Sequence, residues 1–191
     1  MLRPGVSLAV FLLAGAAVAQ DGNPAGVTPG TPEQAPGKPA PHTVNVADRV
    51  FLQQSAIGGM AEVALAELAV ARSHEAEIEA FAERMKTDHG KTNAELKQIA
   101  EAAGVALPGK LDVEHRSMQE RLEKLSGREF DLAYLSAQLT DHQKSAQLLA
   151  YVVGSGQDPV VKDFAAKNLP IILEHLGMVR GLQVKLAGKT A

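Results

Sequence analysis

The segment Phe130–Val153, FDLAYLSAQLTDHQKSAQLLAYVV, decides the fold class of this 191-residue chain. Its apolar residues recur every three or four positions, which places them on one face of an α-helix. Ser126 and Glu129 precede it at the spacing of a capping box. One polar residue interrupts the apolar face, which reads Leu135, Leu139, His142, Ala146, Leu149 and Val153. We therefore expect a long amphipathic helix with a histidine on its core side.

Helical signals fill most of the chain on either side of this segment. Long helices are predicted at about 45–72, 74–103, 128–153 and 159–187, and a short helix is predicted after Asp112. Gly58-Gly59 lies inside the first of them and predicts either a kink or the close approach of another helix. No segment shows sustained alternation of apolar and polar residues, so no β-sheet is expected. The predicted fold class is all-α.

The lengths of the connections predict how the helices are arranged. The first and last pairs of long helices are joined by short links, whereas residues 104–127 form a long middle connection that contains the short helix. Short links make antiparallel hairpins, and a long link can cross the length of a bundle. This order predicts a ferritin-like four-helix bundle with one short extra helix in the long middle connection. The alternative is an up-and-down bundle with the short helix packed against one end.

The residues before the bundle have the pattern of an export signal and a tether. Residues 1–19 combine Arg3, an apolar run and a small-x-small ending at Ala19, as in a cleaved signal peptide; a retained anchor is the alternative. Residues 20–44 are rich in proline and glycine and are expected to be a disordered tether. The helical domain is expected over 45–188. We expect a periplasmic or extracellular protein without a transmembrane segment in its mature form.

Composition excludes several classes of function. The chain has 19 basic and 22 acidic residues, no cysteine and no tryptophan. It therefore has no disulfide and no thiolate metal ligand, and without a basic stripe interleaved with aromatic residues it is not expected to bind nucleic acid. It also lacks a glycine-rich phosphate loop and a nucleophile elbow, so neither a nucleotide enzyme nor a hydrolase is expected. Homo-oligomerisation is left open.

Three histidines are each preceded by an acid and lie near the middle of a predicted helix. His89 stands in TDHGK, His142 in TDHQK and His175 in ILEHLG. Helix midpoints stay level whichever way a helix runs, so the three rings are expected in one layer of the bundle. Each ring lies on an apolar face of its helix, as does Glu62 near the middle of the first helix. By contrast, His74 and His115 are expected to be exposed.

This layer predicts either a metal site or a metal-free polar network. Consecutive helical residues are about 100° apart, so the acids lie at the edge of each histidine's face. The candidate metal ligands are Glu62, Asp88, His89, Asp141, His142, Glu174 and His175. Imidazole and carboxylate together suit iron, manganese, zinc or copper. In the alternative, each buried imidazole donates a hydrogen bond to a carboxylate from another helix, with no metal.

Four segments resemble one protein family. They are FLQQSAIGGMAEVALAELAVARS, FAERMKTDHGKTNAELKQIA, FDLAYLSAQLTDHQKSAQLLAYVV and FAAKNLPIILEHLGMV. They are similar to the domain of unknown function 4142, a family of exported bacterial proteins often labelled putative outer-membrane proteins and grouped with ferritin-like folds. The resemblance covers about Val46 to Leu186. It implies a helical bundle and no particular activity.

The wider ferritin-like di-iron group implies a Glu-x-x-His spacing that this chain lacks. Three residues before His89, His142 and His175 stand Lys86, Leu139 and Ile172. No ferroxidase activity is therefore inferred. We expect an exported bundle protein that holds a metal in its histidine layer. The alternatives are a non-catalytic structural or stress-associated envelope protein and, less favoured, an enzyme acting on small redox substrates.

Overall fold

The computed structural model of the protein describes residues 44–188, which form five α-helices and no strand. The helices are α1 (Val46–Arg72), α2 (Ala76–Ala102), α3 (Val113–Leu122), α4 (Gly127–Ser155) and α5 (Pro159–Gly188). The all-α prediction is confirmed. The expected signal peptide and nearly all of the expected tether lie outside the described residues. Among the described helices, none is both long and apolar enough to cross a lipid bilayer.

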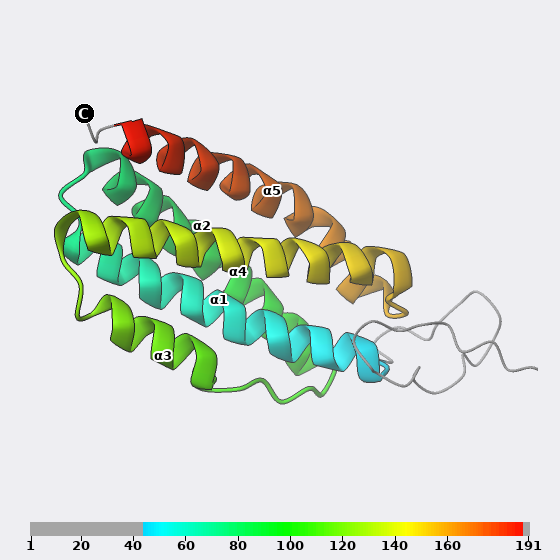
Figure 1. The fold of residues 1–191 in the computed structure, drawn as a ribbon. Helices are drawn as coiled ribbons and strands as arrows, with labels where there is room; N and C mark the ends of the chain where they lie inside the picture. The colour runs from blue at the N-terminus through cyan, green and yellow to red at the C-terminus, as the bar shows by residue number, and fades with distance from the viewer. Residues whose placement is uncertain (1–43, 189–191) are drawn as a thin grey trace, which may run out of the picture.

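The four long helices form a bundle made of two antiparallel hairpins (Figure 1). One hairpin is α1 with α2, the other is α4 with α5, and α1 packs on α4 while α2 packs on α5. The connection after α2 returns along the length of the bundle and carries α3, so α2 and α4 run in the same direction (Figure 1). This single crossover is the arrangement of ferritin-like bundles. The up-and-down alternative is therefore wrong.

Side-chain oxygens cap the start of three helices. Each accepts a hydrogen bond from a backbone N–H in the first turn, a group that has no partner within the helix. The pairs are Asn45 Oδ1 with Asp48 N (2.8 Å), Asp112 Oδ1 with His115 N (2.9 Å) and Asp158 Oδ1 with Val161 N (3.1 Å). These caps fix where α1, α3 and α5 begin.

The predicted capping box at the start of α4 does not form. Ser126 occupies the N-cap position, but its side chain makes no capping hydrogen bond. The next residue, Gly127, has a left-handed backbone with φ of 54°. A capping box requires helical dihedral angles from the first helical residue onward. The left-handed turn at Gly127 therefore prevents the bond from Ser126.

Gly59 allows α1 and α2 to approach closely. A Cβ atom at this position would lie 1.9 Å from Oδ1 of Asn93 on α2, which is far inside van der Waals contact. The helix itself continues without interruption from Val46 to Arg72. The Gly58-Gly59 pair therefore serves the close helix approach, which was one of its two predicted roles.

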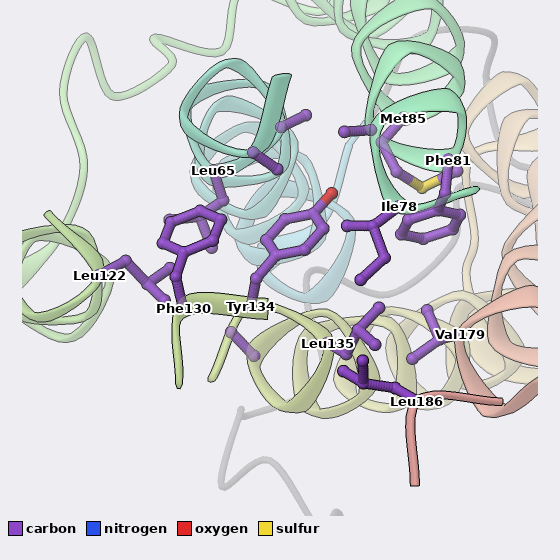
Figure 2. Close-up of a cluster of buried hydrophobic side chains, with 14 residues drawn as sticks. Leu65, Ile78, Phe81, Met85, Leu122, Phe130, Tyr134, Leu135, Val179 and Leu186 are labelled. Carbon is purple, nitrogen blue, oxygen red and sulfur yellow. The ribbon is translucent and has the colours of Figure 1, made fainter. Parts of the chain in front are cut away.

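Two clusters of buried apolar side chains form the core. Figure 2 shows the first, in which the rings of Phe130 and Tyr134 are stacked with centroids 6.1 Å apart and Phe81 meets Tyr134 edge-on at 6.3 Å. In the second, Phe51 packs edge-on against Phe164 at 6.1 Å. The buried layer that contains the predicted histidines lies between these two clusters along the bundle.

A buried carboxylate closes one end of the bundle. Asp48, in the first turn of α1, accepts hydrogen bonds from the backbone N–H groups of Asp158 (3.0 Å) and Gln157 (3.3 Å) in the turn between α4 and α5. Burial raises the pKa of the Asp48 carboxyl above its ordinary value, although these backbone hydrogen bonds oppose the shift. The oxygens of Asp48 therefore stabilise the fold as hydrogen-bond acceptors, whereas the negative charge of the buried carboxylate is unfavourable.

We expect Asp48→Ala to lower the free energy of unfolding by about 1–3 kcal/mol, because it leaves buried N–H groups without an acceptor. Asp48→Asn keeps an acceptor oxygen and removes the disfavoured charge, so it should cost clearly less. Urea unfolding followed by circular dichroism at pH 7 measures both. Equal losses in the two variants would contradict this account of Asp48.

Candidate metal centre

His89 on α2, His142 on α4 and His175 on α5 converge at the middle of the bundle. All three are buried, with His142 and His175 fully inaccessible and His89 6% exposed. Their ring centroids lie 5.3 to 5.5 Å apart. In the described part of the chain, these three histidines form a group that could hold a metal ion, because one nitrogen from each ring lies within 4.8 Å of the other two. The structure thus brings the three predicted histidines together.

The surroundings of His142 determine its tautomer. Nδ1 lies 2.9 Å from the carbonyl oxygen of Gln138, one turn earlier on α4. A carbonyl oxygen only accepts hydrogen bonds, so Nδ1 carries the hydrogen. In the neutral ring, Nε2 then presents a lone pair, and this atom lies 3.4 Å from His89 Nε2 and 3.2 Å from His175 Nδ1.

The surroundings of His175 determine its tautomer in the same way. Its Nε2 lies 3.1 Å from Oδ2 of Asp88 on α2, and a carboxylate only accepts. The hydrogen of a neutral His175 ring is therefore on Nε2, which leaves a lone pair on Nδ1. Two lone pairs, on His142 Nε2 and His175 Nδ1, thus face each other at 3.2 Å. A proton or a metal ion shared by the two nitrogens turns this contact into an attractive one.

Glu62 of α1 supplies a buried negative charge beside the triad. Its Oε1 lies 3.1 Å from His142 Nδ1, and the side chain is 1% exposed. Because the Nδ1 hydrogen is directed to the Gln138 carbonyl, neither Glu62 oxygen completes a hydrogen bond among the described residues. Burial is the largest single influence and raises the pKa of the Glu62 carboxyl, but the charges of His142 and His89 and the polar side chains beside the carboxyl together outweigh it, so the pKa lies below its ordinary value.

The three rings differ in their affinity for protons. Burial lowers the pKa of His89 to about 4, and the charge of Glu62 only partly offsets this. Burial likewise lowers the pKa of His175, despite its hydrogen bond to Asp88. For His142, burial is the largest single influence and lowers the pKa, but the charge of Glu62 together with the contacts of the ring to Glu62 and to the Gln138 carbonyl outweighs it, so the pKa is raised. His89 and His175 are therefore neutral at pH 7 and able to bind a metal, and His142 holds any proton that the triad binds.

The acids that precede the histidines lie in three different places. Asp88 is a partner of His175 and also accepts a hydrogen bond from Arg84 at 3.1 Å. Glu174 is 56% exposed and pairs with Arg84 at 2.9 Å, so the structure does not bring it to the triad. Asp141 faces α3, 3.9 Å from both His115 Nε2 and Lys144 Nζ, and burial raises its pKa to about 6. Consecutive residues of a helix point about 100° apart, so Asp141 and Glu174 are directed away from the neighbouring histidine rings.

His115 is not exposed, contrary to expectation. Its side chain is 12% accessible, and its Nδ1 lies 2.7 Å from Asp112 Oδ1. It is covered because α3 packs against α1 and α4 in the long connection. His74, by contrast, is exposed as expected.

The sequence prediction missed a polar stripe on α4 that continues from His142. The hydroxyl of Tyr134 and both amide atoms of Gln138 are buried and have no hydrogen-bond partner within the described part of the chain. Burial, followed by the charge of Glu62, raises the pKa of Tyr134 well above its ordinary value. The signal was the spacing of four between Tyr134, Gln138 and His142, which places all three on one helix face.

Comparisons with known proteins support the fold and identify a family match. A sequence model of the family described as "Domain of unknown function (DUF4142)" matches residues 33–182. No curated protein matches the chain. A solved DUF305 fragment from Deinococcus radiodurans is similar, with 15% identity, a TM-score of 0.65, and 78% of this chain and 99% of that chain covered. A putative secreted DUF305 protein from Streptomyces coelicolor has 12% identity, a TM-score of 0.64, and coverage of 74% and 94%.

We expect His89 to make the metal-free protein less stable in acid, a contribution that Asp141, with its pKa raised to about 6, opposes. Between pH 6.5 and about 4 the unfolded chain binds a proton at His89 that the folded chain does not, so the contribution of His89 to the free energy of unfolding falls as the pH falls. At about 1.4 kcal/mol per pH unit, the loss across this window is about 3 kcal/mol. Urea unfolding in the presence of a chelator, at pH 7, 6, 5 and 4, measures it.

His89→Gln should remove this contribution, so the variant should lose less stability than the wild type between pH 7 and pH 4. The matched change at the exposed His74, His74→Gln, should leave the pH dependence as in the wild type. If the His89→Gln and wild-type curves ran parallel, the account of His89 as a buried neutral ring would be wrong.

Proposed function

The chain belongs to the family of the domain of unknown function DUF4142, and from this premise we propose that it binds one divalent transition-metal ion between His89, His142 and His175. The family description assigns no activity, so the proposal rests on the site itself.

The observation that carries the proposal is the pair of facing lone pairs on His142 Nε2 and His175 Nδ1, 3.2 Å apart. A metal ion that accepts both lone pairs turns a repulsive contact into two bonds. Tetrahedral sites hold imidazole nitrogens at about 2.0–2.1 Å from the metal, which separates two such nitrogens by about 3.4 Å. The nitrogen separations of 3.2 and 3.4 Å around His142 agree with this spacing.

The donor set favours zinc or copper among the four metals considered. The three nearest groups are imidazoles, and the chain contains no cysteine. The carboxylates of Glu62 and Asp88 contact ring nitrogens instead of pointing into the space between the rings. Histidine-only sites suit zinc and copper, whereas iron and manganese sites usually include carboxylate ligands.

The groups around the rings also suit a metal. A ligating histidine usually donates its other N–H to a carbonyl or carboxylate, which fixes the ring and makes it a better donor. Here the Gln138 carbonyl accepts a hydrogen bond from His142 Nδ1, and the Asp88 carboxylate accepts one from His175 Nε2. The charge of Glu62, 3.1 Å from His142 Nδ1, adds electrostatic stabilisation for a divalent cation in an apolar interior.

A second candidate function is favoured by the raised pKa of His142. A proton on its Nε2 would donate to His175 Nδ1 and would also balance Glu62. The layer would then be a metal-free polar network that specifies how the helices of a non-catalytic envelope protein pack.

We expect the metal-free protein to take up one zinc or copper(II) ion per chain. Binding to the folded state alone should stabilise it by about 2.7 kcal/mol when free metal is 100 times the dissociation constant. Elemental analysis after gel filtration gives the stoichiometry, and thermal unfolding gives the stabilisation. His142→Ala and His175→Gln should each abolish tight binding, with His74→Ala as the matched control that retains it.

The metal-free alternative gives a different set of results. In that case no ion would be retained, added metal would leave the melting temperature unchanged, and His142→Ala would destabilise the protein by about 1–3 kcal/mol by leaving buried partners unpaired.

We expect Asp88→Ala to weaken metal binding about 10- to 100-fold, because His175 loses the acceptor that orients it. Glu174→Ala is the matched control: this exposed acid contacts the same Arg84 but does not reach the triad. Competition with a chelating dye measures both affinities. Equal weakening in the two variants would indicate a general effect of charge near Arg84 and contradict the positioning role of Asp88.

We also propose that the protein is exported. The support is the leader pattern of residues 1–19, which ends in Ala17-Val18-Ala19. Mass spectrometry of the protein expressed in a bacterial host should find a mature chain that begins at Gln20. An intact Met1 on the protein in the cytosolic fraction would contradict export.

A further inference from the structure

A small pocket adjoins the histidine triad on the side of the bundle where α4 turns into α5. Its volume is about 50 Å³, and of the three histidines only His89 lines it. Its polar wall consists of Ser55, Thr92, Asn93, Ser145 and Asn168. His89 is also the one ring of the triad that is partly accessible. The pocket therefore lies between the ring of His89 and these polar residues, of which Asn168 is buried and the others are half-buried.

We infer that this pocket admits a small inorganic ligand to an open position on the bound metal, an inference that rests on the proposed function. Three protein ligands leave a tetrahedral metal with one free position, which is the arrangement of catalytic zinc sites. The ligand class is water or hydroxide and inorganic molecules of two or three heavy atoms, such as dioxygen, peroxide or azide.

The size of the pocket sets this class. One water molecule needs roughly 10–15 Å³ of pocket volume. The pocket volume of about 50 Å³ therefore has room for a ligand of only a few heavy atoms. A ring-sized organic molecule does not fit. The apolar side chains of Leu96, Leu149 and Phe164 close the remaining wall and prevent extension deeper into the second core cluster.

The polar groups of the wall divide into two kinds. Thr92 Oγ1 donates to Asn168 Oδ1 at 3.2 Å, and Asn168 Nδ2 donates to the Phe164 carbonyl at 2.8 Å, so these two side chains are held in place. The amide of Asn93 and the hydroxyl of Ser145 have no hydrogen-bond partner among the described residues. They are available to a ligand that lies in the pocket.

The close helix approach at Gly59 places the Asn93 amide at this site. Because Gly59 has no side chain, the amide occupies space that a Cβ atom would fill, 1.9 Å from Oδ1. The same glycine that allows α1 to approach α2 therefore also positions a free amide in the wall next to His89.

The test uses the full-length protein loaded with one copper(II) ion and titrated with azide, followed by the azide-to-copper charge-transfer absorption. The wild type should show saturable azide binding and no spectral change with imidazole, which is too large for the pocket. Ser145→Leu fills the pocket and should weaken azide binding at least tenfold, while the copper stoichiometry stays at one.

Ser136→Leu is the matched control, because this serine is exposed on the same helix and lies outside the pocket. Ser55→Leu, on α1, provides a second filling variant if Ser145→Leu fails to fold. A copper-loaded protein that does not respond to azide, or filling variants that bind azide like the wild type, would overturn the inference while leaving metal binding intact. Failure to bind copper at all would overturn the proposed function and this inference with it.

Discussion

The contact between the Glu62 carboxylate and the His142 ring, 3.1 Å from Oε1 to Nδ1, constrains how the bundle can be packed. Both groups are buried, and a buried carboxylate without a compensating partner costs several kcal/mol. Sliding α1 against α4 by one helical turn, about 5.4 Å, would separate the Glu62 charge from the His142 ring. The contact therefore specifies one register between these two helices.

The same layer connects all four long helices. His175 of α5 contacts His142 and also Asp88 of α2, and His89 of α2 meets His142 from the other side. Apolar clusters above and below supply the burial that stabilises the bundle, whereas the layer between them specifies how the helices align. A cation shared by the rings, whether proton or metal, would relieve the contact between the two lone pairs that the neutral rings place face to face.

Helical periodicity and connection lengths were sufficient to predict the bundle and its single crossover, because both depend on local properties of the chain. The level of His89, His142 and His175 was also predictable, since helix midpoints coincide whatever the direction of each helix. The capping box at Ser126 was wrong because a left-handed Gly127 follows it, and sequence spacing does not reveal that conformation. His115 was expected at the surface because no local pattern shows that the long connection folds α3 against α1 and α4.

The sequence by itself determined that His89, His142, His175 and Glu62 face inward, because the 3.6-residue repeat assigns each side chain to a face of its helix. Only the tertiary structure decided which acid accepts a hydrogen bond from which histidine. A residue 100° from a ring can lie toward either neighbouring helix, and packing turned Asp88 toward His175, Asp141 toward α3 and Glu174 toward solvent. The tautomers of His142 and His175, and with them the two facing lone pairs, follow from acceptors that packing and the helix backbone place beside each ring.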